Sequence, residues 1–146
     1  MIILDTNVVS ELFRPRPEVR VLTWLESLTR EVAITAITLA ELLAGVHRLP
    51  GGRRKTELTT RIEVALEPYR GTRSVLPFDD AAAEQYAEVL VARERAGLPI
   101  STADAQIAAI CRLHDAVCAT RNGKHFVHTG IELVDPWSEV WIRASI

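Results

Sequence analysis

The feature that most constrains the fold of this chain is a short apolar run at its start. The segment Ile2–Leu4 is wholly apolar and is followed at once by three polar residues, Asp5, Thr6 and Asn7. Such a run is typical of a strand that is buried on both faces in the middle of a parallel sheet. In open α/β sheets, ligands bind beyond the carboxyl ends of the strands. Asp5 is therefore expected to be either a helix cap or a ligand-binding residue.

Further short apolar runs alternate with segments of helical periodicity. Four more strands are expected, at residues 31–35, 74–78, 116–119 and 131–134. Helices are expected at residues 8–13, 38–47, 56–68, 79–97 and 101–114, and another is expected to begin at Pro17. This alternation predicts an α/β fold, with a central, mainly parallel five-stranded sheet flanked by helices. No linker is visible, so residues 1–146 are expected to form one domain, with Trp137 and Trp141 packed back on its body.

Composition limits the class of protein. Hydrophobic residues make up 48% of the chain and charged residues 25%, with a net charge of −2, as in an ordinary soluble globular protein. No apolar run approaches the roughly 20 residues that a membrane-spanning helix needs. No leader precedes the first strand, so a cytoplasmic location is expected. Cys111 and Cys118 are too few for a disulfide framework, and we expect both to be reduced core residues.

Three acids and one amide lie at predicted strand ends or near predicted helix starts. Asp5 ends the first strand, Glu41 and Asp104 lie near helix starts, and Asn122 follows the fourth strand. Each acid has an ordinary structural interpretation. Thr38-x-x-Glu41 matches a capping box, Ser101-x-x-Asp104 is similar, and Asp5 could cap the helix that follows it. Acids in a first helical turn also complement the helix dipole.

Taken together, the acids favour a second interpretation. In a parallel sheet these positions share one edge, and neighbouring carboxylates there would raise one another's pKa. A divalent cation removes that conflict, and Mg²⁺ accepts one or two carboxylates together with several waters. Such a site can activate water for attack on a phosphodiester. Without organised His or Cys residues, the set suits Mg²⁺ or Mn²⁺ better than zinc.

Four motifs carry a family resemblance along nearly the whole chain. With them, the chain resembles the PIN-domain nucleases, and specifically the VapC toxins of VapBC-type bacterial toxin–antitoxin modules. The motifs are Ile3-Leu-Asp-Thr-Asn7, Ile37-Thr-Leu-Ala-Glu-Leu-Leu-Ala-Gly45, Ser101-Thr-Ala-Asp-Ala-Gln-Ile-Ala-Ala109, and Ala119-Thr-Arg-Asn122 followed by Gly130-Ile-Glu-Leu-Val-Asp-Pro-Trp137. The resemblance implies a PIN-like three-layer fold.

The resemblance also implies the roles of the site residues. Asp5, Glu41 and Asp104 would bind the metal, and with Asn122 they are the predicted catalytic residues. Hydrogen bonds from Thr6, Asn7 and Thr120 would support them. Relatives often carry an Asp at the position that matches Asn122, or at the position that matches His125. Asparagine offers a neutral oxygen without charge, so we expect one well-held Mg²⁺, with a second ion arriving with the substrate phosphate.

Basic residues suggest where RNA would bind. Phosphate contacts dominate nucleic-acid affinity. The candidates are Arg121 and Lys124 near the predicted site, and Arg14, Arg53 and Arg54 in earlier parts of the chain. The alternative for the last three is a solvated loop or helix start.

By resemblance, the expected function is that of a Mg²⁺-dependent endoribonuclease that is toxic to its own cell. A cognate VapB-type antitoxin would block it, the pair would bind operator DNA through the antitoxin, and the chain would form a homodimer. Two alternatives remain open. One is a non-catalytic PIN-like module that acts in a DNA-binding repressor complex. The other is a haloacid-dehalogenase-like phosphatase, which would need a second Asp where Asn7 stands.

Overall fold

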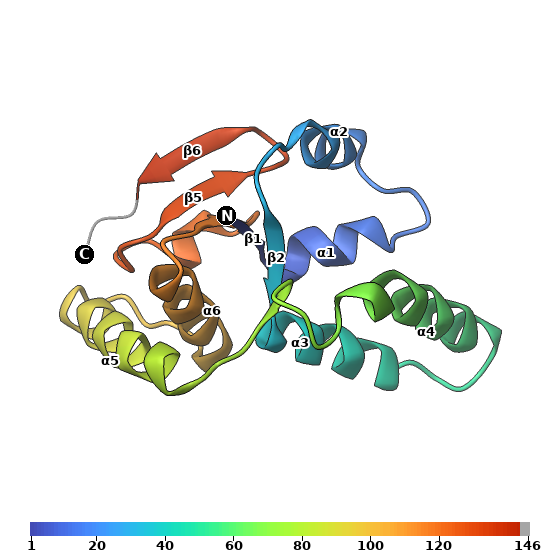
Figure 1. Cartoon of the computed structure of the whole chain (residues 1–146), viewed down its shortest axis with the longest axis horizontal. Coiled ribbons are helices and arrows are strands. Elements are labelled where there is room, and N and C mark those ends of the chain that lie inside the picture. Colours follow the sequence, from blue (N-terminus) through green and yellow to red (C-terminus); the bar gives the residue numbers. More distant parts are fainter. Residues whose placement is uncertain (144–146) are drawn as a thin grey trace.

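The chain folds around a central sheet. The computed structural model describes residues 1–143, in which six strands lie in the order β3-β2-β1-β4-β5-β6 (Figure 1). The strands are β1 (Ile2–Leu4), β2 (Val32–Thr35), β3 (Val75–Leu76), β4 (Val117–Ala119), β5 (Glu132–Asp135) and β6 (Val140–Arg143). All neighbours are parallel except β5 and β6, which are antiparallel. The last three residues of the predicted domain, 144–146, lie outside the described residues.

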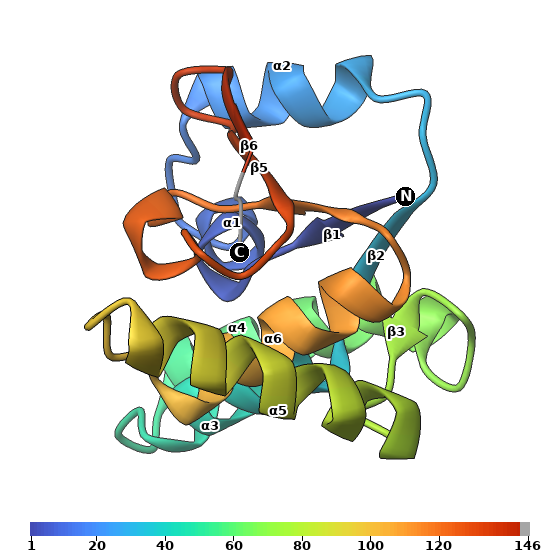
Figure 2. The ribbon, with the colours of Figure 1, turned by 90° about the vertical axis from the view of Figure 1, so that its left-hand side faces the viewer.

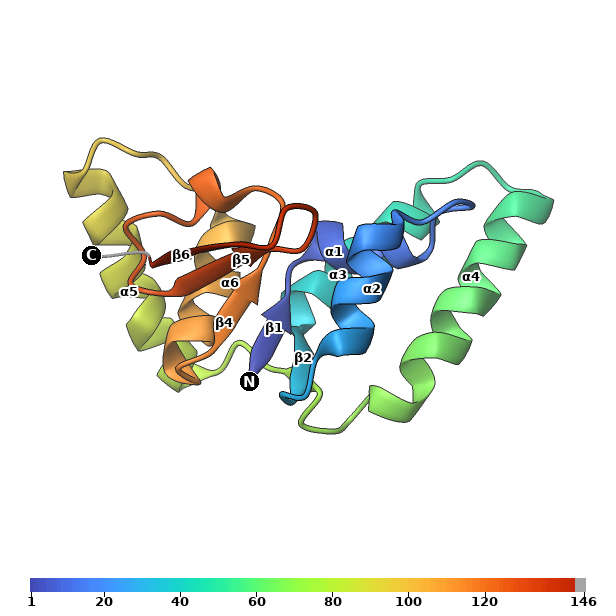
Figure 3. The same ribbon diagram turned by 90° about the horizontal axis from the view of Figure 1, so that it is seen from above.

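Helices cover both faces of the sheet. They are α1 (Thr6–Leu12), α2 (Val19–Ser27), α3 (Ala36–His47), α4 (Arg53–Leu66), α5 (Asp80–Arg95) and α6 (Thr102–Leu113), with short 3₁₀ turns η1 (Glu67–Tyr69) and η2 (Gly123–His125). Seen from above, α5 and α6 lie to one side of the strands and α1, α2 and α4 lie to the other (Figure 3). The view in Figure 2 shows α5 alongside α6. These three layers confirm the predicted fold class.

Alternation along the strands divides the core between the two faces. Ile2 and Leu4 pack with the residues of α1 to α4, whereas Ile3 packs with those of α5 and α6. Successive strand residues point to opposite faces, so a strand covered on both sides must be apolar throughout. Cys111 and Cys118 are both free and buried, which confirms the expectation of reduced core cysteines. No helix among the described residues is long and apolar enough to cross a membrane.

The prediction of five strands was wrong, because the chain adds a sixth. Asp135-Pro136 was expected to end the sheet, but it opens a turn in which Ser138 N donates to Asp135 O over 3.2 Å. Glu139 then adopts a φ of 56°, and the chain returns as β6, antiparallel to β5. Trp137 packs against the core as expected. Trp141, by contrast, lies on this edge strand and is 51% exposed.

Four predicted helix starts were also wrong. Helix α1 begins at Thr6 rather than at residue 8, and α4 begins at Arg53 rather than at residue 56. Helix α3 is capped by Thr35, whose Oγ1 accepts a 3.1 Å hydrogen bond from Thr38 N. Thr38 therefore lies inside the helix, and no capping box with Glu41 forms. Helix α2 is capped by Glu18, so Pro17 precedes the cap rather than occupying the first helical position. Helix α3 thus starts directly after strand β2, and Glu41 lies in its second turn rather than in its first.

Candidate active site

The carboxyl end of the central strand β1 places Asp5 in a buried position. Its side chain caps α1, because Oδ1 accepts a 2.8 Å hydrogen bond from Thr6 N. The other oxygen, Oδ2, accepts a 2.8 Å hydrogen bond from the hydroxyl of Thr120. Asp5 is only 5% exposed. The two interpretations of Asp5 are thus compatible, since it caps the helix and still lines a cavity.

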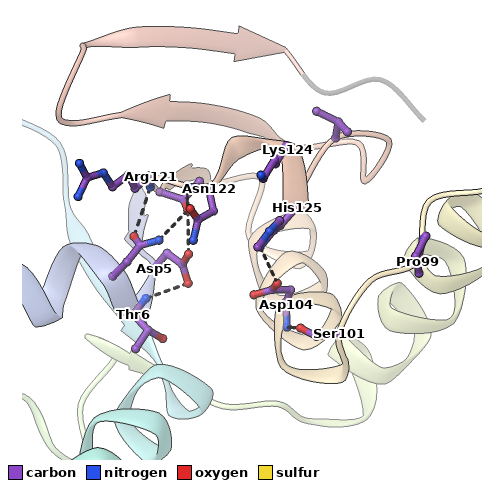
Figure 4. Close-up of polar contacts among 12 residues, drawn as sticks. Asp5, Thr6, Pro99, Ser101, Asp104, Arg121, Asn122, Lys124 and His125 are labelled. Atoms are coloured by element: carbon purple, nitrogen blue, oxygen red, sulfur yellow. Dashed lines mark hydrogen bonds and ion pairs between the residues drawn. The ribbon is translucent and has the colours of Figure 1, made fainter.

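Polar residues after β4 meet the start of α1. Thr120 Oγ1 also accepts a 3.0 Å hydrogen bond from Asn122 N, and Asn7 Nδ2 lies 3.4 Å from the same oxygen. Asn7 Oδ1 in turn accepts a 3.3 Å hydrogen bond from Arg121 N. These contacts hold the loop after β4 against the first turn of α1, beside Asp5 (Figure 4).

Glu41 reaches the site from α3. Its Oε1 accepts a 2.7 Å hydrogen bond from the hydroxyl of Thr6, and that hydroxyl lies 3.1 Å from Thr38 Oγ1. Thr38 is buried, whereas Glu41 is exposed. The Thr6 hydroxyl therefore links Glu41, on the helix that follows β2, to the segment that carries Asp5.

Asp104 approaches from the opposite side, on the first turn of α6. Ser101 caps this helix, and its Oγ accepts a 3.1 Å hydrogen bond from Asp104 N. The carboxylate points toward His125, whose Nδ1 lies 3.4 Å from Asp104 Oδ2 (Figure 4). The N-cap at Ser101 was predicted, but the contact with His125 was not.

One open cavity of about 460 Å³ joins these elements. Among the predicted site residues, its lining includes Asp5, Thr6, Asn7, Arg14, Glu41, Asp104, Arg121 and Asn122. Thr120 and Lys124 line a neighbouring cavity that shares Arg121 and Asn122 with the first. Arg53 and Arg54 lie at the start of α4 and line neither of the two. The structure thus brings all the predicted acids to one cavity, while Arg53 and Arg54 lie elsewhere.

The cavity also contains groups that the sequence interpretation missed. Glu11 is only 3% exposed and accepts hydrogen bonds of 3.0 and 3.1 Å from Arg14 Nη1. Asn7, Ser10, Glu11 and Arg14 follow an i, i+3, i+4, i+7 pattern and all line the cavity. That spacing marks one face of a helix, so it could have identified Glu11. The indole of Trp137, also in the lining, lies 4.8 Å beneath the Arg121 guanidinium.

The electrostatics of the cavity are unfavourable for the buried acid. Burial raises the pKa of Asp5 above its usual value, and the hydrogen bonds from Thr120 and Thr6 oppose that rise. The negative charges of Asp104 and Glu41 raise the pKa of Asp5 further. A cation in the cavity would reverse this last effect, because it would attract each carboxylate.

The donor set can be compared with what a metal ion needs. The acids offer hard oxygen ligands, and neither cysteine belongs to the cavity lining. Within residues 1–143, no three His, Cys, Asp or Glu side chains are grouped closely enough to enclose an ion. Mg²⁺ needs only one or two carboxylates and keeps several waters. The residues therefore fit Mg²⁺ or Mn²⁺ held mainly through water, and they do not fit a zinc cage.

Fold and site together define a small α/β protein with an acid-lined cavity beyond the central strands. The PIN domain family model matches residues 2–132, so the chain belongs to the PIN-domain family. It is 41% identical over 140 residues to Toxin FitB of Neisseria gonorrhoeae, covering 95% of this chain and 100% of that one. It is 38% identical over 138 residues to VapC ribonuclease Y4jK of Sinorhizobium fredii, covering 94% and 98%.

A solved complex shows the same fold. The structure of FitAB bound to an IR36 DNA fragment contains a chain that superposes with a TM-score of 0.85 at 40% identity, covering 94% of this chain and 96% of that one. These matches confirm the resemblance to VapC toxins that the four motifs indicated.

Proposed function

We propose that this protein is a Mg²⁺-dependent endoribonuclease that acts as the toxin of a toxin–antitoxin pair. The observation that carries the proposal is the buried carboxylate of Asp5, which shares one cavity with Glu41 and Asp104 and whose pKa their charges raise. A structural helix cap would gain nothing from two further acids. The relative named as a VapC ribonuclease supports RNA as the substrate class.

Each side chain has a task in this proposal. Asp5, Glu41 and Asp104 would hold Mg²⁺, which supplies an activated water and neutralises phosphate charge. Thr120 and Thr6 orient the two oxygens of Asp5 by their 2.8 Å hydrogen bonds. Arg14 and Arg121, at the rim of the same cavity, would bind the RNA backbone.

We further propose that a cognate VapB-type antitoxin binds this protein and blocks the cavity. The complex would bind operator DNA through the antitoxin, as the DNA-bound structure of FitAB suggests by analogy. The chain itself has a net charge of −2, so its bulk electrostatics do not favour direct binding to DNA. We expect it to form a homodimer, which light scattering of the purified protein would test.

The direct test is cleavage of total RNA by the purified, antitoxin-free protein. We expect fragments when Mg²⁺ is added. We expect no cleavage with EDTA, and a loss of at least about a hundredfold in Asp5→Asn. Asp80→Asn is the matched control, because Asp80 is an exposed acid in the first turn of α5.

The outcomes separate the remaining alternatives. Cleavage that survives both EDTA and Asp5→Asn would contradict a metal-dependent site at Asp5. If the wild-type protein cleaves no RNA but its complex with the antitoxin still binds operator DNA, the non-catalytic binding module is the better description. A phosphorylated form of Asp5 trapped during turnover would instead favour the phosphatase alternative.

A further inference from the structure

A second cavity adjoins the acidic one and is not needed to hold a metal. It has a volume of about 540 Å³ and shares Arg121 and Asn122 with the acidic cavity. One wall consists of the loop after β4, with Gly123 and Lys124. The opposite wall is the β5–β6 hairpin. Small-molecule sites commonly have volumes of about 300–1,000 Å³, so the space is of the right order for one group of a larger substrate.

Part of the hairpin wall is apolar because of the register of β5 and β6, and Asp135 and Ser138 line the same cavity. Leu133 pairs with Ile142 across the two strands, and Asp135 pairs with Val140. Val140 and Ile142 lie on the same face of β6, because alternate residues of a strand share a face. They are 51% and 42% exposed, although both are large aliphatic residues. Exposed apolar side chains beside a polar site can pack against a flat apolar group.

The loop wall supplies the polar and charged groups. Asn122 and Lys124 are both exposed. Within residues 1–143, the Asn122 side-chain amide makes no hydrogen bond, although its backbone N–H donates to Thr120. An amide offers both a donor and acceptors. Lys124 adds a positive charge on the side away from the acids of the first cavity (Figure 4).

We propose that this second cavity binds a single unstacked nucleobase of the RNA, next to the phosphodiester at the acidic cavity. This inference rests on the proposed ribonuclease function and deepens it. Sequence-specific proteins read RNA mostly at single-stranded positions, with the base splayed out, packed on side chains and hydrogen-bonded at its edge. Val140 and Ile142 would contact the face of the base, Asn122 its edge, and Lys124 the adjoining phosphate.

Gly123 lines the cavity, so a side chain added at this position would fill part of it. A Cβ at this position would lie 3.7 Å from Ile142 Cδ1 and 3.9 Å from Leu133 Cδ1, which is ordinary van der Waals contact. Gly123→Leu would therefore occupy more of the cavity than Gly123→Ala. The matched control is Gly45→Leu, because nothing lies within 4 Å of a Cβ at Gly45.

The test combines these variants with a pair of RNAs. The first is a fluorescein-labelled RNA that spans a cleavage site mapped by sequencing the fragments of total RNA. The second is the same RNA with an abasic nucleotide at a position that flanks the cut, and each flanking position is tested in turn. We expect the abasic change at one position to lower the wild-type kcat/KM about tenfold, mainly through KM, as removal of one base contact does.

The variants then decide whether the lost contact is at this cavity. Gly123→Leu should cleave the intact RNA about tenfold less well and should lose nothing more on the abasic RNA. Gly45→Leu should behave like the wild type. The proposal would be overturned if the abasic RNA lowered kcat/KM equally in the wild type and in Gly123→Leu. It would also be overturned if Gly123→Leu cleaved RNA as the wild type does and only its binding to the antitoxin were weaker. Circular dichroism measures whether each variant folds. If Gly123→Leu does not fold, Gly123→Ala takes its place in the same comparison of the two RNAs.

Failure of the proposed function is recognised separately. If the wild-type protein cleaves no RNA, the catalytic proposal fails. Binding of single-stranded RNAs with and without one abasic position, measured by fluorescence anisotropy, then tests the base site alone. Equal affinities for the two RNAs would overturn it.

Discussion

The hydroxyl of Thr120 donates a 2.8 Å hydrogen bond to Asp5 Oδ2, joining residues that are 115 positions apart in the chain. The hydroxyl oxygen of Thr120 also accepts a hydrogen bond from Asn122 N, 3.0 Å away. One buried side chain therefore fixes both the carboxylate at the end of β1 and the loop after β4. This loop forms part of both cavities.

Replacing Thr120 by valine should damage the site without changing its shape. Thr120→Val leaves an oxygen of Asp5 without a donor and the Asn122 N–H without an acceptor, so we expect a loss of about 1–3 kcal/mol in the free energy of unfolding. RNA cleavage at limiting Mg²⁺ should fall by about 10–100-fold. Urea denaturation and Mg²⁺ titration of the cleavage rate measure the two effects.

Thr120→Ser is the matched control, since it keeps the hydroxyl and loses only a methyl group. It should retain most of the cleavage activity. If the valine variant binds Mg²⁺ and cleaves RNA as the wild type does, then Thr120 has no part in orienting Asp5.

The crowded acids should lower stability when no metal is bound. Asp104 is one of the charges that raise the pKa of Asp5, so Asp104→Asn should raise the melting temperature in EDTA at pH 8. We expect a rise of about 2–4 °C for each kcal/mol of relieved repulsion. Differential scanning fluorimetry measures it.

Adding Mg²⁺ should reverse that order of melting temperatures. Ligand binding to the native state stabilises the wild type by about 2.7 kcal/mol at one hundred times Kd, and Asp104→Asn should gain less. Asp80→Asn, in an exposed first-turn position, should respond to Mg²⁺ as the wild type does. A wild-type melting temperature that does not change with Mg²⁺ would contradict the assignment of the metal ligands.

The indole of Trp137 should support binding of RNA by Arg121. The Arg121 guanidinium lies 4.8 Å from the Trp137 ring centroid, and such contacts contribute about 0.5–2 kcal/mol. Trp137→Leu should therefore raise KM for RNA several-fold with little change in kcat. Trp141→Leu is the control, because Trp141 lies beneath Arg30 instead. A fall in kcat alone would show that Trp137 does not act through RNA binding.

A buried arginine should stabilise the segments around the site. Arg93 is 4% exposed, and its guanidinium donates to the carbonyls of Val127 over 2.8 Å and Pro99 over 2.9 Å. These carbonyls belong to the segments that precede α6 and follow η2. Arg93→Met would leave them unpaired, so we expect a loss of about 3 kcal/mol in unfolding free energy.

Urea denaturation of Arg93→Met compares it with Arg95→Met, which changes an exposed arginine in the same helix turn. The second variant should lie within about 0.5 kcal/mol of the wild type. Similar stabilities for the two variants would mean that the Arg93 hydrogen bonds do not hold the two segments.

The sequence identified the parallel strands because their residues are apolar on both faces. It missed β6 because the breaker Asp135-Pro136 looks like an end, whereas a turn containing Glu139 at positive φ reverses the chain there. The N-cap at Ser101 was predicted correctly. The cap of α3 was not, because the backbone leaves β2 and enters the helix without a loop, and Thr35 rather than Thr38 meets the free N–H groups.

The first segment of the chain, which ends in Asp5, Thr6 and Asn7, also shows what the sequence could and could not predict. By itself, the sequence determined that Asp5 follows a buried strand and that Glu41 and Asp104 lie near helix starts, because period and spacing fix these placements locally. Only the tertiary structure decided what surrounds Asp5, namely the Thr120 hydroxyl and Glu11 in the same cavity, and that a second cavity lies next to the first beside Gly123. These contacts depend on side chains from distant segments, whose meeting is set by the packing of the whole chain.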